Sequence, residues 1–447
     1  MTIIKPFAGF RFDASRAGEL VDLIAPPYDV INPELQQELL ARSPFNVIRL
    51  IRNEPEPGDN ERRNRYTRSA GLWRDWRRSG VIRRDPQPRL YRYNVSFHLK
   101  TPQGIVARER PGFVALLKLH EYDEGKVRPH ERTLAGPKQD RFQLMLATRA
   151  HFSQVFMLYP DPKGKVDALL GAAPPAGAEV WSAEDDAGVT HNMWTVEDPK
   201  TIAAVNDHLS REPIYIADGH HRYETALAIR RHLAETSPLF AGGSDYMMCY
   251  FTPAEHPGLT VFPYHRLIHD LPKRRLSGML KKLEAGFRVE RALVSPFSPG
   301  NARREFMAGL SERGGRGPSF ALVDGAAGEA WHLTLRPETQ LSRECRSEAE
   351  AVLCGLDVVI IEDLILSGIL GIKHKDLLNE KHVSYETDYD RVLDAVQKPP
   401  NQLGFLMNPT PVSKVLEVAD LAGVMPEKST YFFPKLATGL VMNSFEE

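Results

Sequence analysis

Hydrophobic residues recur along the chain with two periods, and each period predicts one kind of element. In LYRYNVSFHL (residues 90–99) and GFVALLKLHEY (residues 112–122), apolar and polar residues alternate, which is typical of strands in an antiparallel or mixed sheet. IYIA (residues 214–217) indicates a buried strand, and the segment after it is apolar at helical spacing, at Tyr223, Ala226, Ile229 and Leu233. The pattern predicts an α/β fold with additional mixed-sheet α+β segments.

Two segments interrupt this pattern and predict where the chain divides. AAPPAGAEVWSAEDDAG (residues 172–188) is rich in Ala, Pro and acidic residues, and residues 298–319 are rich in Gly and Arg around a short helix. A chain of 447 residues also exceeds the size of an ordinary single domain. We therefore predict an N-terminal α/β region over residues 1–190, a central region over 191–295 and a C-terminal α/β region over 296–447.

Composition narrows the class of protein. With 57 basic and 58 acidic residues, the chain has no general surface for polyanions, so we do not expect a nucleic acid as its partner. One Arg-rich segment, residues 60–80, carries its aromatic side chains on a single helical stripe, which favours a docked helix with a solvated Arg face over a strand-binding surface. No stretch approaches the roughly 18 apolar residues of a membrane span, and no signal peptide precedes the first strand-like runs.

The cysteines predict a reducing compartment. Cys249, Cys345 and Cys354 are scattered without a CxxC pair, so we expect neither a disulfide framework nor a zinc knuckle. Together with the lack of a leader or membrane span, this predicts a cytoplasmic protein.

The segment EPIYIADGHHRY (residues 212–223) carries the densest chemistry. Asp218 to Arg222 stand between a predicted strand and a predicted helix, and such a turn directs free backbone N–H groups and the positive end of the helix dipole outward. Gly219 lets a ligand approach the backbone, so phosphate is the expected ligand.

The side chains of this turn predict specific roles. Asp218 is expected to hold a divalent metal, for which Mg²⁺ fits better than zinc, or to accept a proton. His220 and His221 can shuttle protons or contact phosphate, and Arg222 can clamp its oxygens. In the structural alternative, Asp218 caps the helix and the histidines bond nearby carbonyl groups.

Other polar loops are predicted to meet this turn in one cleft. RPHERTLAGPKQDR (residues 128–141) has the charge density suited to a pyrophosphate or triphosphate, with a solvated surface loop as the alternative. MPEKSTYFFPK (residues 425–435) is not a Walker A loop, although lysine beside two hydroxyl groups can bind an anion. From these loops we expect phosphate or nucleotide contacts at His130, Arg141, Lys428, Ser429, Thr430 and Lys435.

A general base is predicted at one of two carboxylates. In IAPPYDVI (residues 24–31), Asp29 stands on a stiff Pro-containing loop, where it can serve as a base or as an ordinary turn residue. Glu131, in the HERT loop, is the other choice. FPYHRLI (residues 262–268) offers Tyr264, His265 and Arg266 as further residues that can face the same cleft.

These motifs resemble those of a known family. IADGHHRYETAL, IAPPYDVI, RPHERTLAGPKQDR and MPEKSTYFFPKLATGLVMN are similar to segments of the domain-of-unknown-function 1015 (DUF1015) family of bacterial proteins, from about residue 3 to the end. GHHRY also resembles the phosphate-binding turn of the ParB and sulfiredoxin-like superfamily, which implies a small α/β core and includes kinases of free L-serine. His220 stands where sulfiredoxins carry their cysteine, which excludes their thiol chemistry here.

Motifs and resemblance together predict a small-molecule phosphotransferase, with free L-serine as the suggested acceptor and a nucleotide or pyrophosphate as donor. Asp218 would bind the metal or orient the nucleophile, His220, His221 and Arg222 would hold phosphate oxygens, and Asp29 or Glu131 would take the hydroxyl proton. The alternatives are a regulatory protein that senses a nucleotide through the same turn without catalysis, and a phosphohydrolase that uses water as the acceptor.

Overall fold

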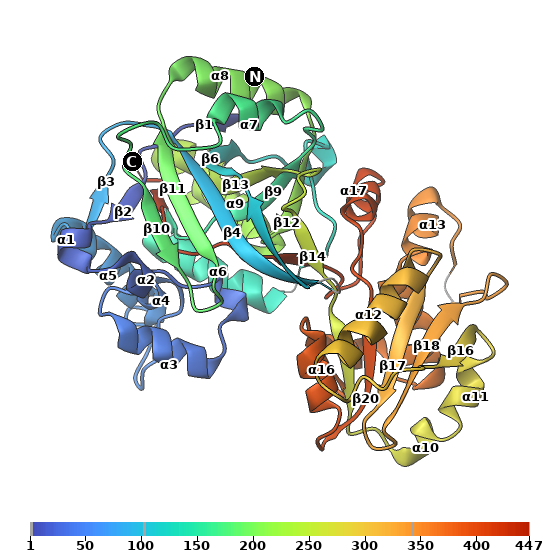
Figure 1. The fold of residues 1–447 in the computed structure, drawn as a ribbon. Coiled ribbons are helices and arrows are strands. Elements are labelled where there is room, and N and C mark those ends of the chain that lie inside the picture. The colour runs from blue at the N-terminus through green and yellow to red at the C-terminus, as the bar shows by residue number, and fades with distance from the viewer. Residues whose placement is uncertain (1–2, 102–103, 134, 342–343, 447) are drawn as a thin grey trace.

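The computed structural model describes residues 3–101, 104–133, 135–341 and 344–446, which form two lobes (Figure 1). The large lobe (residues 3–262 and 431–446) is built on a ten-stranded mixed sheet, and the small lobe (residues 265–420) on a six-stranded sheet. Figure 1 shows the yellow-to-red small lobe beside the blue-to-green large lobe. The predicted α/β class is confirmed.

The large sheet brings the first half of the chain together around the predicted phosphate turn. Its strands follow the order β10-β11-β4-β6-β13-β9-β12-β7, while β1 pairs with β6 and β5 with β4. β12 lies antiparallel to β9 and parallel to β7. The strands are β1 Ile4–Lys5, β4 Leu90–Thr101, β5 Gly104–Arg110, β6 Phe113–Lys118, β7 Val127–Arg128, β9 Val155–Tyr159, β10 Trp181–Glu184, β11 Thr190–Val196, β12 Ile214–Asp218 and β13 Tyr246–Pro253.

Both faces of this sheet are covered. Along β6, Phe113, Ala115 and Leu117 belong to a core shared with the helices α7 Lys165–Leu170, α8 Pro199–Arg211 and α9 His220–Thr236. Val114 and Leu116 belong to the core on the other face, to which the C-terminal segment contributes Phe432, Leu436 and Val441. Strands that are buried on both faces read as nearly continuous apolar runs, and this is why IYIA shows no alternation.

A helical layer packs beside the large sheet. It contains α1 Ala14–Ala17, α2 Leu20–Leu23, α3 Pro33–Arg42, α4 Ile48–Ile51, α5 Arg65–Arg78 and α6 Ala135–Thr148, with the short 3₁₀ helices η1 Tyr28–Val30 and η2 Tyr122–Glu124 nearby. On α5, Trp73 and Trp76 are buried, while Arg68 pairs with Asp59. The Arg-rich segment is thus a docked helix, as the aromatic stripe predicted. The remaining elements of this lobe are the pairs β2 Phe10–Phe12 with β3 Ile82–Arg84 and β8 Ala150–His151 with β22 Asn443–Ser444, and η3 Pro238–Asp245.

The small lobe is an antiparallel sheet covered by helices. Its strand order is β16-β18-β17-β20-β15-β19. The strands are β15 His265–His269, β16 Phe287–Arg291, β17 Ser319–Asp324, β18 Glu329–Leu335, β19 Val383–Glu386 and β20 Asn401–Met407. The helices are α10 Lys273–Leu276, α11 Met279–Leu283, α12 Asn301–Gly314, α13 Glu348–Cys354, α14 Asp357–Ile360, the π-helix η4 Ile361–Ile369, α15 His374–Leu378, α16 Tyr389–Ala395 and α17 Val412–Asp420.

The chain passes between the lobes in two neighbouring strands. β14 Thr260–Phe262 enters the small lobe and β21 Tyr431–Phe433 returns from it, and the two strands pair antiparallel, with Phe262 opposite Tyr431. The small lobe is therefore inserted into a hairpin of the large lobe. The division of the chain at residues 190 and 295 stays a prediction from sequence.

The cysteines correct one expectation. Cys345 and Cys354 form a disulfide, with Cα atoms 6.4 Å apart, where the spacing had predicted no disulfide framework. Spacing gave no signal because the two cysteines are nine residues apart, without a CxxC pair: Cys345 precedes α13 and Cys354 is its last residue. Cys249 is a buried free thiol. Among the helices in the described ranges, none combines the length and the apolar character needed to cross a membrane.

Candidate functional site

The predicted strand-to-helix turn is present at the end of β12. Gly219 is the N-cap of α9 and has a φ of 95°, in the left-handed region that glycine adopts without strain. As a glycine, this N-cap residue has no side chain to cap the helix, and the two carboxylate oxygens of Asp218 bind Arg222 and Lys435. The alternative in which Asp218 caps the helix is therefore wrong, and the turn keeps the donor geometry of an anion site.

Asp218 itself is held between two cations. The Nζ of Lys435 lies 2.5 Å from its Oδ1, and the Nη2 of Arg222 lies 2.8 Å from its Oδ2. Burial works against ionisation, but these cations hold the pKa of Asp218 below its ordinary value. In turn, the negative charge of Asp218 holds the pKa of Lys435 above its ordinary value, although burial lowers it. Asp218, Arg222 and Lys435 thus form a largely buried ion triad joining the turn to the C-terminal segment.

This triad bears directly on the predicted magnesium ion. Mg²⁺ takes carboxylate oxygens that are free to coordinate it, and both oxygens of Asp218 are already bound to cations. Within the part of the chain that the structure describes, no three His, Cys, Asp or Glu side chains are grouped so as to hold a metal ion. Asp218 does not fit the role of a metal ligand, and we derive no step through a protein-held metal.

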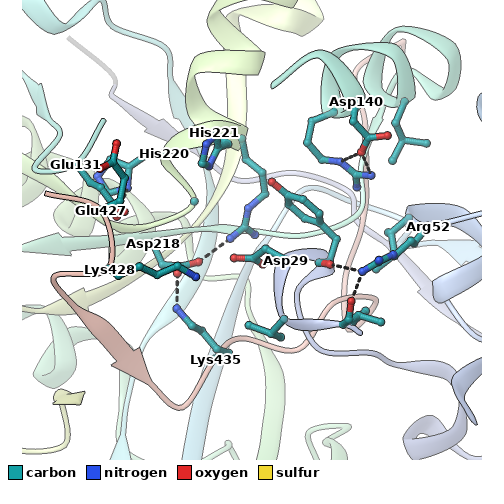
Figure 2. A pocket seen from close by; sticks show the side chains of 18 of the residues that line it. Asp29, Arg52, Glu131, Asp140, Asp218, His220, His221, Glu427, Lys428 and Lys435 are labelled. Atoms are coloured by element: carbon teal, nitrogen blue, oxygen red, sulfur yellow. Dashed lines mark hydrogen bonds and ion pairs between the residues drawn. The ribbon is translucent and has the colours of Figure 1, made fainter. Parts of the chain in front are cut away.

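The turn opens into a cavity of 610 Å³ that gathers segments from distant parts of the sequence, which we call the site cavity. Figure 2 shows Glu131, His220 and Glu427 grouped on one side, Asp218, Lys428 and Lys435 next to them, and Asp140 and Arg52 on the opposite side. The four predicted motifs meet here, as expected. Of the predicted residues, it is lined by Asp29, Glu131, Arg141, Asp218, Gly219, His220, His221, Arg222, Tyr264, Lys428, Thr430 and Lys435.

His220 is a buried neutral imidazole. Its burial, with the neighbouring His130, lowers its pKa well below the ordinary value. The backbone N–H of His130 donates to His220 Nε2 at 3.4 Å, so the single ring proton lies on Nδ1. That Nδ1 is 4.0 Å from a carboxylate oxygen of Glu131. His220 can therefore present an N–H toward Glu131 but does not carry a positive charge to a phosphate.

Among the carboxyl groups that line the cavity, Glu131 has a raised pKa, whereas those of Asp218 and Asp140 are lowered. Burial, the charge of Asp218 and the nearby Glu427 raise its pKa to about 7, against the opposing effect of Lys435. An isolated parallel bridge between Glu131 and Met425 places the HERT loop beside the C-terminal loop that carries Glu427. A carboxyl group that titrates near neutrality in a cavity is suited to accept a proton from a hydroxyl group.

The opposite wall of the cavity is rich in arginine and aromatic side chains. Asp140 accepts hydrogen bonds from Tyr66 at 2.9 Å and from Arg65 at 2.7 Å, and it also binds Arg141. The Arg141 guanidinium stacks 4.1 Å from the ring centre of Tyr28. Arg141 is thus present at the cavity wall, but with its charge already shared with Asp140.

Four predicted residues do not reach the cavity surface. His130 is 1% exposed, and its Nε2 lies 3.2 Å from the hydroxyl of Thr430. Ser429 is 2% exposed, and its hydroxyl donates to the Pro426 carbonyl. His265 and Arg266 are also buried, with His265 Nδ1 accepting from the Met407 N–H. Direct phosphate contact by His130 and Ser429 stays a prediction from their motifs; in this structure both side chains are bound within the loops that carry the lining residues.

Sequence reasoning missed several lining residues. Glu427 stands inside the MPEKSTY motif, next to the lysine and hydroxyl residues predicted to bind phosphate, so its signal was available. Arg65 and Tyr66 were assigned with the rest of α5 to packing and a solvated face. Arg52 follows an apolar helix, α4, and donates to the carbonyl of Tyr28 at 3.1 Å; no motif marks it.

The chain is similar in shape, at a low level, to several solved structures. A free serine kinase in complex with AMP shares 12% identity, covering 69% of this chain and 83% of that one with a TM-score of 0.32. A conserved hypothetical protein from Pyrococcus furiosus shares 12% over 70% and 89%, also with a TM-score of 0.32. SbnI from Staphylococcus aureus, truncated at its C-terminus, shares 9% over 73% and 85%, with the same score. TM-scores this low carry no argument about a ligand or an activity.

The curated proteins contain no match to this chain. The motifs that line the site cavity do, however, fall largely within one family pattern. The family model described as protein of unknown function DUF1015 matches residues 4–359, well over half of the sequence, and the chain therefore belongs to the DUF1015 family.

Proposed function

We propose that the protein transfers a phosphoryl group from a phosphorylated donor to a hydroxyl group of a small metabolite. One observation carries the proposal: the N-terminus of α9, which begins after Gly219, opens into the same cavity as Glu131, whose pKa is raised to about 7. The first feature suits phosphate oxygens and the second suits a general base. A phosphate-binding protein without catalysis has no need of the second feature.

The donor phosphates are assigned to the α9 end of the cavity. The N–H groups of the first turn and the positive end of the helix dipole favour an anion there. Lys435 lies beside the turn, bound to Asp218, and Lys428 lines the same cavity with a side chain that is 42% exposed. Asp218 and Arg222 act by holding Lys435 and the turn in place rather than by binding a metal.

The acceptor is assigned to the side of Glu131. Its hydroxyl oxygen attacks the terminal phosphorus, the hydroxyl proton passes to the Glu131 carboxylate, and the bond to the leaving phosphate oxygen breaks with its electron pair on the donor product. The His220 Nδ1–H faces Glu131 and orients it. Free L-serine is the first acceptor to test, because the GHHRY turn resembles that of a superfamily with free-serine kinases.

The test is product formation. The purified protein is incubated with L-serine and each of ATP, ADP and pyrophosphate, with and without magnesium, and phosphoserine is followed by phosphorus NMR and mass spectrometry. We expect product with one donor and its loss in Glu131→Gln, while the matched variant Glu124→Gln, a surface carboxylate of η2, keeps activity. Ligand binding without product across a broad panel of hydroxylated metabolites would contradict phosphotransfer and leave nucleotide sensing as the function.

A further inference from the structure

A second cavity, of 240 Å³, adjoins the site cavity and is built from different side chains. It lies among α2, α3, the turn between β10 and β11, and residues 431–437; we call it the side cavity. Val30 and Lys435 line both cavities, so the two meet at these side chains. The proposed transfer chemistry makes no use of the side cavity.

The walls of the side cavity are apolar and aromatic. Ile24, Leu35, Leu39, Tyr431 and Phe433 are among its lining residues. Tyr431 stands at the junction, because the Nζ of Lys435 lies 4.3 Å from the centre of its ring. An aromatic wall next to a phosphate-binding lysine offers a stacking surface to a flat ring joined to a phosphate chain.

Apart from Lys435, which binds Asp218, the acidic and basic side chains of the side cavity are paired with one another. His191 Nε2 lies 3.2 Å from Asp185 Oδ2, and the other ring nitrogen lies 2.9 Å from the Tyr93 hydroxyl. Arg42 pairs with Asp186. Since these groups already have partners, the side cavity favours an uncharged part of a ligand over another phosphate.

The volume of the side cavity suits one part of a ligand rather than a whole one. Complete small-molecule sites usually enclose about 300–1,000 Å³; the site cavity falls within this range and the side cavity, at 240 Å³, falls below it. We propose that the side cavity binds the nucleobase of a nucleotide whose phosphates lie at the α9 turn. The proposal rests on the proposed phosphotransfer site and selects a nucleotide, rather than pyrophosphate, as the donor.

The test compares ligands that share a phosphate chain. By isothermal titration calorimetry, ATP is expected to bind the native protein at least about tenfold more tightly than tripolyphosphate, which lacks the nucleoside. Leu35→Trp and Val21→Phe add bulk to the side cavity from α3 and α2. Each is expected to weaken ATP binding by about tenfold and to leave tripolyphosphate binding within about twofold. Ala228→Phe, which fills a separate cavity of 510 Å³ between α6 and α9, is expected to change neither.

Each outcome of these binding measurements supports or overturns the assignment of the side cavity to a nucleobase. Equal affinities for ATP and tripolyphosphate in the native protein, or unchanged ATP affinity in both filled variants, would overturn the nucleobase assignment. A filled variant that raises only the acceptor KM would overturn it in favour of an apolar acceptor group. If neither filled variant folds, the comparison of ligands on the native protein still decides. Nucleobase-dependent binding without product would support the side cavity while refuting phosphotransfer, and no binding of either ligand would refute both.

Discussion

Glu131 gives the sharpest test at the scale of a residue. Glu131→Gln keeps the size of the side chain but removes the base, so kcat is expected to fall by about 10²–10⁴-fold with little change in nucleotide affinity. Because the base acts when ionised, kcat of the native protein should rise as pH increases through about 7 and then level off. Steady-state kinetics from pH 5 to 9 measure both effects.

A second variant tests whether the pH dependence of kcat comes from Glu131. Glu427→Gln removes a negative charge that raises the pKa of Glu131, so the inflection in kcat is expected to move to lower pH while activity persists. An inflection that stays at the same pH in Glu427→Gln, or that survives in Glu131→Gln, would assign the titration to another group.

The ion triad predicts a stability effect at a second residue. Asp218→Asn leaves Lys435 and Arg222 without their carboxylate, so the free energy of unfolding is expected to fall by about 3–5 kcal/mol. The pKa of Asp218 is lowered on folding, so its stabilisation is fully present above the unfolded value of 3.8, decreases as pH falls below it and is lost as pH falls through the lower pKa of the folded state. Urea denaturation at pH 7 and pH 3 measures the effect, and the double variant Asp218→Asn/Lys435→Met should recover part of the loss. A loss below about 1 kcal/mol would mean that the triad is not formed.

At the scale of an element, the α9 turn can be tested against another helix of the same chain. Gly219 and Gly164 both cap a helix in the left-handed conformation, α9 and α7 respectively. An added Cβ at Gly219 would lie 2.8 Å from Arg222 Nη2, whereas at Gly164 it would meet open space. Gly219→Ala should therefore abolish the rise in Tm caused by pyrophosphate or ATP, while Gly164→Ala should cost only about 1 kcal/mol of backbone strain. Equal ligand shifts in both variants would place the phosphate site elsewhere.

The same element shows how far the sequence could predict the site. The turn from β12 to α9 follows from local pattern, because an apolar run, a glycine and a helical stripe are contiguous in sequence. The partner of Asp218 does not: Lys435 is 217 residues away, and no local rule connects them. The same reason explains why His130 and Ser429, polar residues in charged loops, are buried: long-range packing between loops decides their exposure.

At the scale of the whole molecule, the sequence indicated strands and helices but not how the lobes connect. Breaks in composition near residues 172–188 and 298–319 fall inside a lobe: the first contains β10 of the large sheet, and the second spans α12 of the small lobe. The two lobes are joined at the β14–β21 pair, which brings together residues about 170 apart in sequence and leaves only a short apolar signal on each side. Lys428 and Glu427 lie just before the returning strand, so the junction also completes the site cavity.

This insertion predicts an asymmetry in how the pieces fold. Residues 264–424 contain all six strands of the small sheet with their covering helices, so this fragment is expected to unfold cooperatively on its own. Residues 1–262 alone should not fold, because Leu440, Val441 and Met442, each at most 4% exposed, would be missing from the core of the large lobe. Since Phe262 and Tyr431 are directly paired, joining residue 262 to residue 431 by a short turn should restore folding of the large lobe without the small one. Circular dichroism and urea denaturation of the three proteins measure this. A folded 1–262 fragment, or an unfolded 264–424 fragment, would show that the hairpin insertion does not define the folding units.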